Sequence, residues 1–155
     1  MPPPFIHITQ VTAENFDTFL TLIADLAEYE HLPPPNKEAQ TRLRRDYQSS
    51  PPRYYAYIAT INGKPVGYIT YYFIYSTFLA LPTLFLEDIF VQEDYRKLGL
   101  GQSLFDFVKQ QAKTAGCGRI EFAVLKWNKL AQDFYGKNGA KCLDWYIYRI
   151  DKADF

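Results

Sequence analysis

Residues 84–101 read LFLEDIFVQEDYRKLGLG and combine the strongest structural signals in the chain. The first eight residues form an apolar run that two acids interrupt, which favours a buried strand carrying charge for a functional reason. Leu104, Phe105 and Val108 then recur at helical spacing after a basic loop, so a helix is expected from Leu100 to about Thr114. The sequence therefore predicts a strand, a glycine-containing loop and a helix in succession.

The loop at residues 96–101, RKLGLG, is suited to hold an anion. Glycines let backbone N–H groups approach an anion closely, because no Cβ is in the way. The N-terminus of the helix contributes partial positive charge, and Arg96 and Lys97 add full charges. The short string also fits an ordinary loop before a helix. It is not a P-loop, because the Lys-Ser/Thr ending is absent, and it is not a dinucleotide-binding fingerprint, because that motif follows its strand immediately.

The rest of the chain alternates between strand and helix patterns. The expected strands are residues 5–9, 54–61, 66–75, 119–125 and one or two within 141–150, and the expected helices are residues 16–27, 36–47 and 128–139. Asn62-Gly63-Lys64-Pro65 predicts a hairpin turn, and Asn36 and Asn128 are placed to cap helices. This order predicts one mixed α/β domain over residues 1–155.

Composition disfavours several classes of function. The chain has 155 residues and is 48% hydrophobic, which is enough for one buried core. Its 17 basic and 17 acidic residues cancel, which disfavours binding to nucleic acid or to an anionic membrane surface. No apolar run approaches the length of about eighteen residues that a membrane-spanning helix needs, and no signal-peptide pattern is present, so we expect a cytoplasmic protein. Cys117 and Cys142 lack partners at ligand spacing, so no metal site is expected.

Three segments together resemble the GNAT superfamily of N-acetyltransferases, and within it the diamine and thialysine acetyltransferases. They are LEDIFV at residues 86–91, DYRKLGLG at residues 94–101, and Trp127-Asn128 leading to Phe134-Tyr135 and Gly139-Ala140. Weaker similarity at residues 71–73 and 26–30 extends the resemblance over nearly the whole chain. It implies a mixed, mostly antiparallel sheet of about six to seven strands with about four helices, in which a splayed strand pair forms the acetyl-CoA cleft.

The resemblance also implies a binding site for acetyl-CoA as co-substrate. Its pantetheine arm is expected to pair with the acid-bearing strand, and its pyrophosphate is expected to lie on the glycine-containing loop. The implied cofactor-binding residues are Ile89, Phe90, Val91, Arg96, Lys97, Leu98, Gly99, Leu100, Gly101, Gln102, Asn128 and Tyr135. The cofactor contact of Asn128 and its role as a helix cap can coexist.

Two residues have implied catalytic roles. An alkyl amine with a pKa near 10.4 is only about one part in two thousand neutral at pH 7, so the attacking amine must lose a proton. Glu87 is placed to remove it, directly or through water, although a carboxylate here can instead serve only to bind the ammonium. Asp88 is expected to point to the opposite side of a regular strand and to be structural. Tyr135 occupies the family position of the acid that protonates the departing thiolate.

The substrate is implied less directly. Tyr29 and Glu30 match positions where relatives contact substrate, which places them with Glu87 as substrate-binding residues. Ser76 and Phe78 stand where polyamine-acetylating relatives have Asp and Trp. Residues 141–148 also lack the acidic insertion of those relatives. These departures favour a short diamine or a lysine-like amino acid such as thialysine over spermine.

The expected reaction is direct transfer in a ternary complex. Acetylation of a protein or peptide amine remains an alternative, as does a non-catalytic acyl-CoA sensor. The resemblance also implies a homodimer, formed through the aromatic residues 71–75 or through the final strands.

Overall fold

The computed structural model describes residues 2–155, which form two compact units, residues 2–122 and residues 123–155. The first unit contains β1 (Ile6–Gln10), α1 (Phe16–Tyr29), α2 (Lys37–Tyr47), β2 (Tyr55–Ile61), β3 (Lys64–Ser76), β4 (Leu81–Val91), a 3-10 turn (Glu93–Tyr95), α3 (Leu100–Thr114) and β5 (Arg119–Glu121). The second contains α4 (Lys129–Lys137) and a 3-10 turn (Lys152–Asp154). Every expected helix is therefore present.

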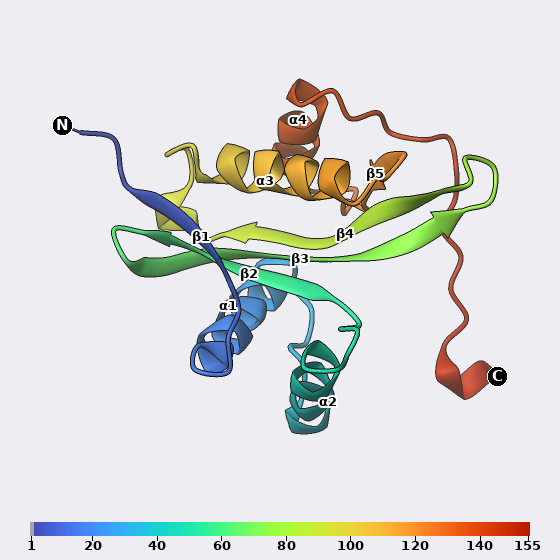
Figure 1. Cartoon of the computed structure of the whole chain (residues 1–155), viewed down its shortest axis with the longest axis horizontal. Coiled ribbons are helices and arrows are strands. Elements are labelled where there is room, and N and C mark those ends of the chain that lie inside the picture. The colour runs from blue at the N-terminus through green and yellow to red at the C-terminus, as the bar shows by residue number, and fades with distance from the viewer. Residues whose placement is uncertain (1) are drawn as a thin grey trace. The chain divides into compact units, whose positions relative to one another are not determined.

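A single five-stranded sheet organises the first unit, in the order β1-β2-β3-β4-β5. Neighbouring strands are antiparallel except for β4 and β5, which are parallel. Helices α1 and α2 lie on one face of the sheet, and α3 lies on the other (Figure 1). The sheet is thus mixed and mostly antiparallel, as the resemblance implied.

The expectation of about six to seven strands was wrong. Residues 141–150 form no strand within residues 2–155, and β5 ends at Glu121 instead of residue 125. The final segment is rich in aromatic and β-branched residues, yet its side chains are largely exposed, from 57% at Leu143 to 90% at Tyr148. Such residues favour an extended chain, but a strand forms only where a neighbouring strand accepts its hydrogen bonds. In the described part of the chain, this segment pairs with none.

Local chemistry explains several element boundaries. The side chain of Asn36 accepts a hydrogen bond from the N–H of Ala39 at 2.9 Å, which confirms the predicted cap of α2. The hairpin turn is tighter than expected, because Asn62 and Gly63 both have positive φ and Ile61 already pairs with Lys64.

Different helices pack on the two faces of the sheet. Phe16, Phe19 and Leu22 of α1 pack into a core with Tyr68 of β3 and Phe90 of β4. On the other face, α3 buries Leu100, Leu104, Phe105, Val108 and Ala112. Burial of α1 and α3 fixes both helices against the strands that carry the predicted site residues.

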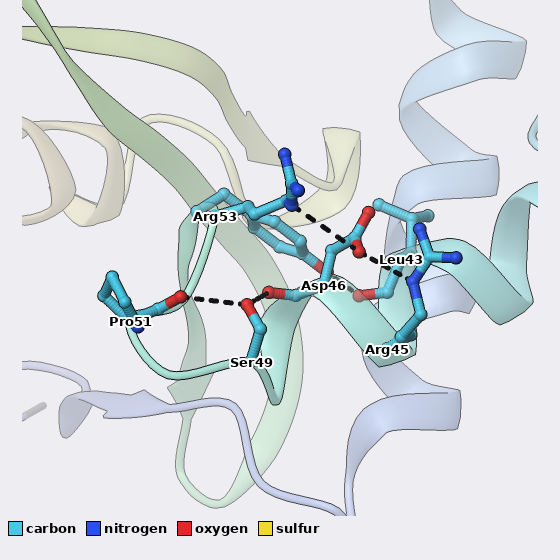
Figure 2. Close-up of polar contacts among 7 residues, drawn as sticks. Leu43, Arg45, Asp46, Ser49, Pro51 and Arg53 are labelled. Carbon is cyan, nitrogen blue, oxygen red and sulfur yellow. Dashed lines mark hydrogen bonds and ion pairs between the residues drawn. The ribbon is translucent and has the colours of Figure 1, made fainter.

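Polar contacts tie the C-terminal end of α2 to the start of β2 (Figure 2). The hydroxyl of Tyr54 donates to the carbonyl of Leu43 at 2.8 Å. Asp46 accepts from Arg45 at 2.8 Å and lies 3.8 Å from Arg53. The two ion pairs are exposed to solvent and stabilise little by themselves, so the partly buried bond from Tyr54 is the firmer attachment of the helix.

We expect Gly67→Ala to destabilise the protein, because β3 and β4 approach each other closely at this glycine. An added Cβ would lie 2.5 Å from the carbonyl oxygen of Phe90 and 3.5 Å from Val91, so the strand backbone would have to shift. Overpacking of this kind costs about 1–3 kcal/mol of unfolding free energy, which urea denaturation would measure. Gly136→Ala is the matched control, since its Cβ would meet nothing within 4 Å in a helix. An equal loss in both variants would contradict this reason.

Candidate active site

A β-bulge in β4 brings Glu87 and Asp88 onto the same face of the sheet. Thr70 of β3 pairs with Asp88, and the next residue, Tyr71, pairs with Leu86, which leaves Glu87 as the extra residue. A bulge of this kind breaks the alternation of side chains along a strand. The expectation that Asp88 points away from Glu87 was therefore wrong. Both acids face the side of the sheet that α1 and α2 cover.

Both carboxylates line one cavity of about 280 Å³. Its walls come from α1, α2, β3, β4 and the residue that precedes β2, and its lining residues are Phe19, Ile23, Leu43, Tyr54, Thr70, Tyr72, Glu87 and Asp88. Most of these side chains are apolar or aromatic. The cavity is at the small end of the range for small-molecule sites, about 300–1,000 Å³.

Glu87 is held at this cavity by Tyr72 of β3. The Tyr72 hydroxyl donates to Oε2 of Glu87 at 3.1 Å. Burial, with the neighbouring charge of Glu87, raises the pKa of Tyr72 to about 12, so the phenol stays protonated as a donor at neutral pH. One oxygen of Glu87 is thus oriented by the strand, and the other can contact a substrate.

Asp88 lies deeper in the fold than Glu87. The Thr70 hydroxyl donates to Oδ2 of Asp88 at 2.7 Å. Burial raises the pKa of Asp88 to about 6, assisted by the charges of Glu87 and Glu30 and opposed by hydrogen bonds from Thr70 and Tyr68. This carboxylate therefore changes its charge close to neutral pH.

Glu30 brings a third carboxylate to this region from the C-terminal end of α1. Burial and the charge of Glu87 raise the pKa of Glu30. Glu30 also lines a second cavity of about 160 Å³ together with Tyr68 and Asp88. The structure therefore brings together Glu30 and Glu87, two of the residues predicted to bind substrate.

No group of three or more His, Cys, Asp or Glu side chains among residues 2–155 is arranged to hold a metal ion.

Arg96 links the loop before α3 to Tyr29, the third predicted substrate residue. Its guanidinium lies over the Tyr29 ring, 4.5 Å from the ring centroid, and its Nε donates to the carbonyl of Val91 at 2.9 Å. Tyr29 also packs against Phe90, with ring centroids 6.5 Å apart. The side chain of Arg96 therefore fixes Tyr29 beside β4, in addition to the phosphate contact predicted for it.

The predicted cofactor segment has an open strand edge and a left-handed loop. The β4–β5 ladder covers only residues 83–85 of β4, and no strand in the described chain pairs with that edge over residues 86–91. Lys97 and Gly99 then have φ of 63° and 85°, and α3 begins at Leu100. Apart from Gly99 and its two chain neighbours, no heavy atom lies within 4 Å of the point that a Cβ on Gly99 would occupy, so the approach to this backbone is open. Ile89, Phe90, Val91, Lys97, Leu98, Gly101 and Gln102 all lie in this segment or in the first turn of α3.

Asn128 and Tyr135 belong to the second unit. Oδ1 of Asn128 accepts from the N–H of Ala131 at 3.1 Å, which confirms its role as the cap of α4. Tyr135 lies on α4 next to Phe134, with ring centroids 5.4 Å apart. The cofactor contact of Asn128 and the acid role of Tyr135 stay predictions.

Sequence reasoning missed three residues of the cavity region. Tyr68, Thr70 and Tyr72 alternate along β3 and face the same side as the acids of β4. Their partners depend on the pairing register, which local sequence does not specify. The adjacent acids in an apolar strand were the one available signal of the bulge, because regular alternation would send one of them to the opposite face.

The open edge of β4, the glycine-containing loop and the two carboxylates in the cavity all lie in the segment that the sequence motifs singled out. The sequence matches the Acetyltransferase (GNAT) family over residues 19–140. The chain therefore belongs to the GNAT family of acetyltransferases, as the sequence motifs indicated.

Several curated relatives of this chain are amine acetyltransferases. The chain is 35% identical over 159 residues to the thialysine N-epsilon-acetyltransferase of Bos taurus, with 95% of this chain and 93% of that protein covered. It is 38% identical to the Sus scrofa protein of the same name, with 94% and 92% covered. It is also 29% identical to the human spermidine/spermine N(1)-acetyltransferase-like protein 1, with 97% of this chain and 23% of that protein covered.

Solved structures share the fold at lower identity. A possible acetyltransferase from Clostridium difficile 630 superposes with a TM-score of 0.81 at 19% identity, covering 94% of this chain and 97% of that one. Aminoglycoside N-acetyltransferase AAC(6')-Iy, solved in complex with CoA, superposes with a TM-score of 0.78 at 18% identity, covering 97% of both chains. The fold is thus that of the GNAT acetyltransferases. No helix among the described residues is long and apolar enough to cross a bilayer.

Proposed function

We propose that this protein transfers the acetyl group of acetyl-CoA to the primary amine of a small diamine, a polyamine or a lysine-like amino acid such as thialysine. The observation that carries this proposal is the pair of adjacent carboxylates, Glu87 and Asp88, in a cavity of about 280 Å³. Negative charge in a small, largely apolar cavity favours an alkyl ammonium ion over an extended peptide. The relationship to thialysine acetyltransferases supports the same substrate class.

The proposed co-substrate site is the open edge of β4 together with the start of α3. When bound there, acetyl-CoA supplies the activated acetyl group as a thioester. The β4 edge over residues 86–91, which no strand of the described chain pairs with, is suited to pair with an extended amide chain, and the backbone around Gly99 is suited to hold phosphate oxygens. Arg96 and Lys97 add positive charge to this loop.

The proposed mechanism is direct attack by the amine in a ternary complex. Glu87 accepts a proton from the substrate ammonium, while Tyr72 holds the carboxylate in place. Tyr29 and Glu30 contact the alkyl and cationic parts of the substrate. Tyr135 donates a proton to the departing sulfur.

We also propose that the protein acts as a homodimer and uses the exposed aromatic end of the β3–β4 hairpin, where Tyr75 is 66% and Phe78 100% exposed.

The proposal is tested by measuring release of the CoA thiol from acetyl-CoA across diamines, polyamines, thialysine, lysine and peptides. We expect turnover with short diamines or thialysine. Activity on peptides alone would replace the proposed substrate class by protein acetylation. Binding of acetyl-CoA with no turnover on any amine would instead support the acyl-CoA sensor.

A second prediction tests the co-substrate loop. We expect Gly99→Val to weaken acetyl-CoA binding about tenfold, because its side chain would fill the open approach to the backbone and would disfavour the left-handed conformation. Isothermal calorimetry measures the dissociation constant. Gly116→Val is the matched control, since Gly116 also has positive φ and no atom within 4 Å of an added Cβ, but lies at the other end of α3. Unchanged affinity in a folded Gly99→Val protein would remove this loop from the proposed site.

A further inference from the structure

We propose that Asp88 is a second proton acceptor of the active site, so that the substrate ammonium meets a pair of carboxylates instead of Glu87 alone. This inference rests on the proposed amine acetyltransferase function and deepens it. It assigns a catalytic role to a residue that regular strand alternation would place on the opposite face.

The geometry of the bulge carries the proposal. Glu87 and Asp88 are consecutive, face the same side of the sheet and line the same cavity. Asp88 also lines the second cavity, with Glu30 and Tyr68. An amine that enters the larger cavity therefore reaches Glu87 at its exposed edge and Asp88 at its buried side.

The groups around Asp88 are suited to a carboxyl that gains and loses a proton. Thr70 and Tyr68 of β3, Glu87 of β4 and Glu30 at the end of α1 face it, and no basic side chain among residues 2–155 forms an ion pair with it. A nearby Lys or Arg would keep the carboxylate ionised and lower its affinity for a proton. Without one, burial and the acidic neighbours favour the protonated form.

Tyr68 places a phenol beside Asp88. Tyr68 is fully buried and lines the second cavity with Asp88. Burial raises the pKa of Tyr68, and the charge of Asp88 and a hydrogen bond to its carboxylate add to the shift, so the phenol remains neutral. A neutral phenol can donate to the Asp88 carboxylate whenever that carboxylate is ionised.

The proton step balances without any further reactant. The N–H bond of the ammonium breaks, an O–H bond forms on the carboxylate, and the nitrogen keeps the electron pair that attacks the thioester carbon. The C–S bond breaks, and sulfur leaves with its electron pair. After the attack, the nitrogen loses a second proton. This proton restores the hydroxyl of Tyr135, which has given its own proton to sulfur. Asp88 then releases its proton to solvent past Glu87, so one proton leaves per turnover.

The raised proton affinity of Asp88 suits this role. Transfer from an ammonium of pKa near 10.4 to an ordinary Asp carboxylate of pKa about 3.9 is unfavourable by more than six pKa units. A carboxylate with a pKa of about 6 reduces that gap by about two units, yet is still mostly ionised at pH 7.

Asp88→Asn is the direct test, measured as kcat and kcat/KM against pH with saturating acetyl-CoA and a short diamine or thialysine. We expect kcat at pH 7 to fall about tenfold and the inflection of kcat/KM near pH 6 to disappear. Asp17→Asn removes an exposed carboxylate from α1 and should leave both profiles unchanged. A rise in KM with kcat preserved would overturn the proposal in favour of simple ammonium binding.

Thr70→Val provides a second variant of nearly the same shape. It removes the hydrogen bond that lowers the pKa of Asp88, so the inflection should move to higher pH. An inflection that stays in place in this variant would mean that another group sets it, which overturns the assignment.

Stability against pH gives a readout that does not depend on activity. Because the pKa of Asp88 is raised in the folded state, the folded protein binds more protons than the unfolded chain between about pH 4 and 6, and its stability falls as pH rises through this window. Asp88→Asn removes this pH-dependent loss of stability. The melting temperature of the variant should therefore rise relative to that of the wild type from pH 4 to 7. A constant difference would show that Asp88 holds no proton at near-neutral pH.

These measurements separate the two proposals. A wild-type protein that acetylates no amine overturns both. An active wild type whose Asp88→Asn variant keeps its kcat and its inflection overturns only the role of Asp88.

Discussion

Tyr135→Phe should lower turnover about a hundredfold or more and leave acetyl-CoA binding unchanged. The substitution keeps the ring next to Phe134 on α4 and removes only the hydroxyl. A proton donated to the departing sulfur neutralises the negative charge that develops on it, and general acid catalysis commonly contributes about 10²–10⁴ in rate. The loss should appear equally in kcat and kcat/KM, because the donated proton matters only in the transition state.

The measurement pairs steady-state kinetics with calorimetry of acetyl-CoA binding. Tyr146→Phe is the control, since it removes a hydroxyl from a ring that is 85% exposed. Near-wild-type turnover in Tyr135→Phe would eliminate the acid role. Weakened acetyl-CoA binding with normal turnover would make Tyr135 a binding residue instead.

Much of the fold was predictable because its signals are local. The helical spacing of Phe16 and Phe19, the cap at Asn36 and the turn at Asn62-Gly63 each act within a few residues of the chain. The motif at residues 84–101 placed a strand, a loop and a helix correctly for the same reason. Together with the motif around Asn128, it also identified the family.

The errors concern features that depend on distant partners. Residues 141–150 have the composition of a strand but pair with no other strand in the described chain. Propensity alone therefore overestimated the number of strands in the sheet. The bulge at Glu87 depends on the register between Thr70 and Asp88, which is fixed by two complete strands. Its consequence was large, because it moved Asp88 from the opposite face into the candidate active site.

The predicted site residues are those that lie at positions matching the family. Glu87, Glu30 and Tyr29 were expected on resemblance, and the structure places them around neighbouring parts of β4. The contribution of Tyr72 could not be anticipated, since a chain with 13 tyrosines gives no sign of which one donates to Glu87. The cation–π contact of Arg96 with Tyr29 was hidden in the same way, because the two residues are far apart in sequence.

Glu87→Gln should lower kcat at saturating amine by about a hundredfold near neutral pH, and the deficit should shrink as pH rises. Gln retains an oxygen that can accept the hydrogen bond from Tyr72, so the local geometry is kept while the base is lost. Only about one part in two thousand of an alkyl amine is neutral at pH 7, and this fraction grows about tenfold for each pH unit. A substrate that arrives already neutral no longer needs a base.

The pH profile separates a base from a carboxylate that only holds the ammonium. If Glu87 only binds, the substitution should raise KM and leave kcat nearly unchanged, because a uniform binding interaction has been removed. Amines of lower pKa add a second comparison, since a substrate that is largely neutral at pH 7 should lose little kcat in the variant. A defect confined to KM and independent of pH would refute the assignment of Glu87 as a base, and the charge of Glu87 would then serve substrate affinity alone.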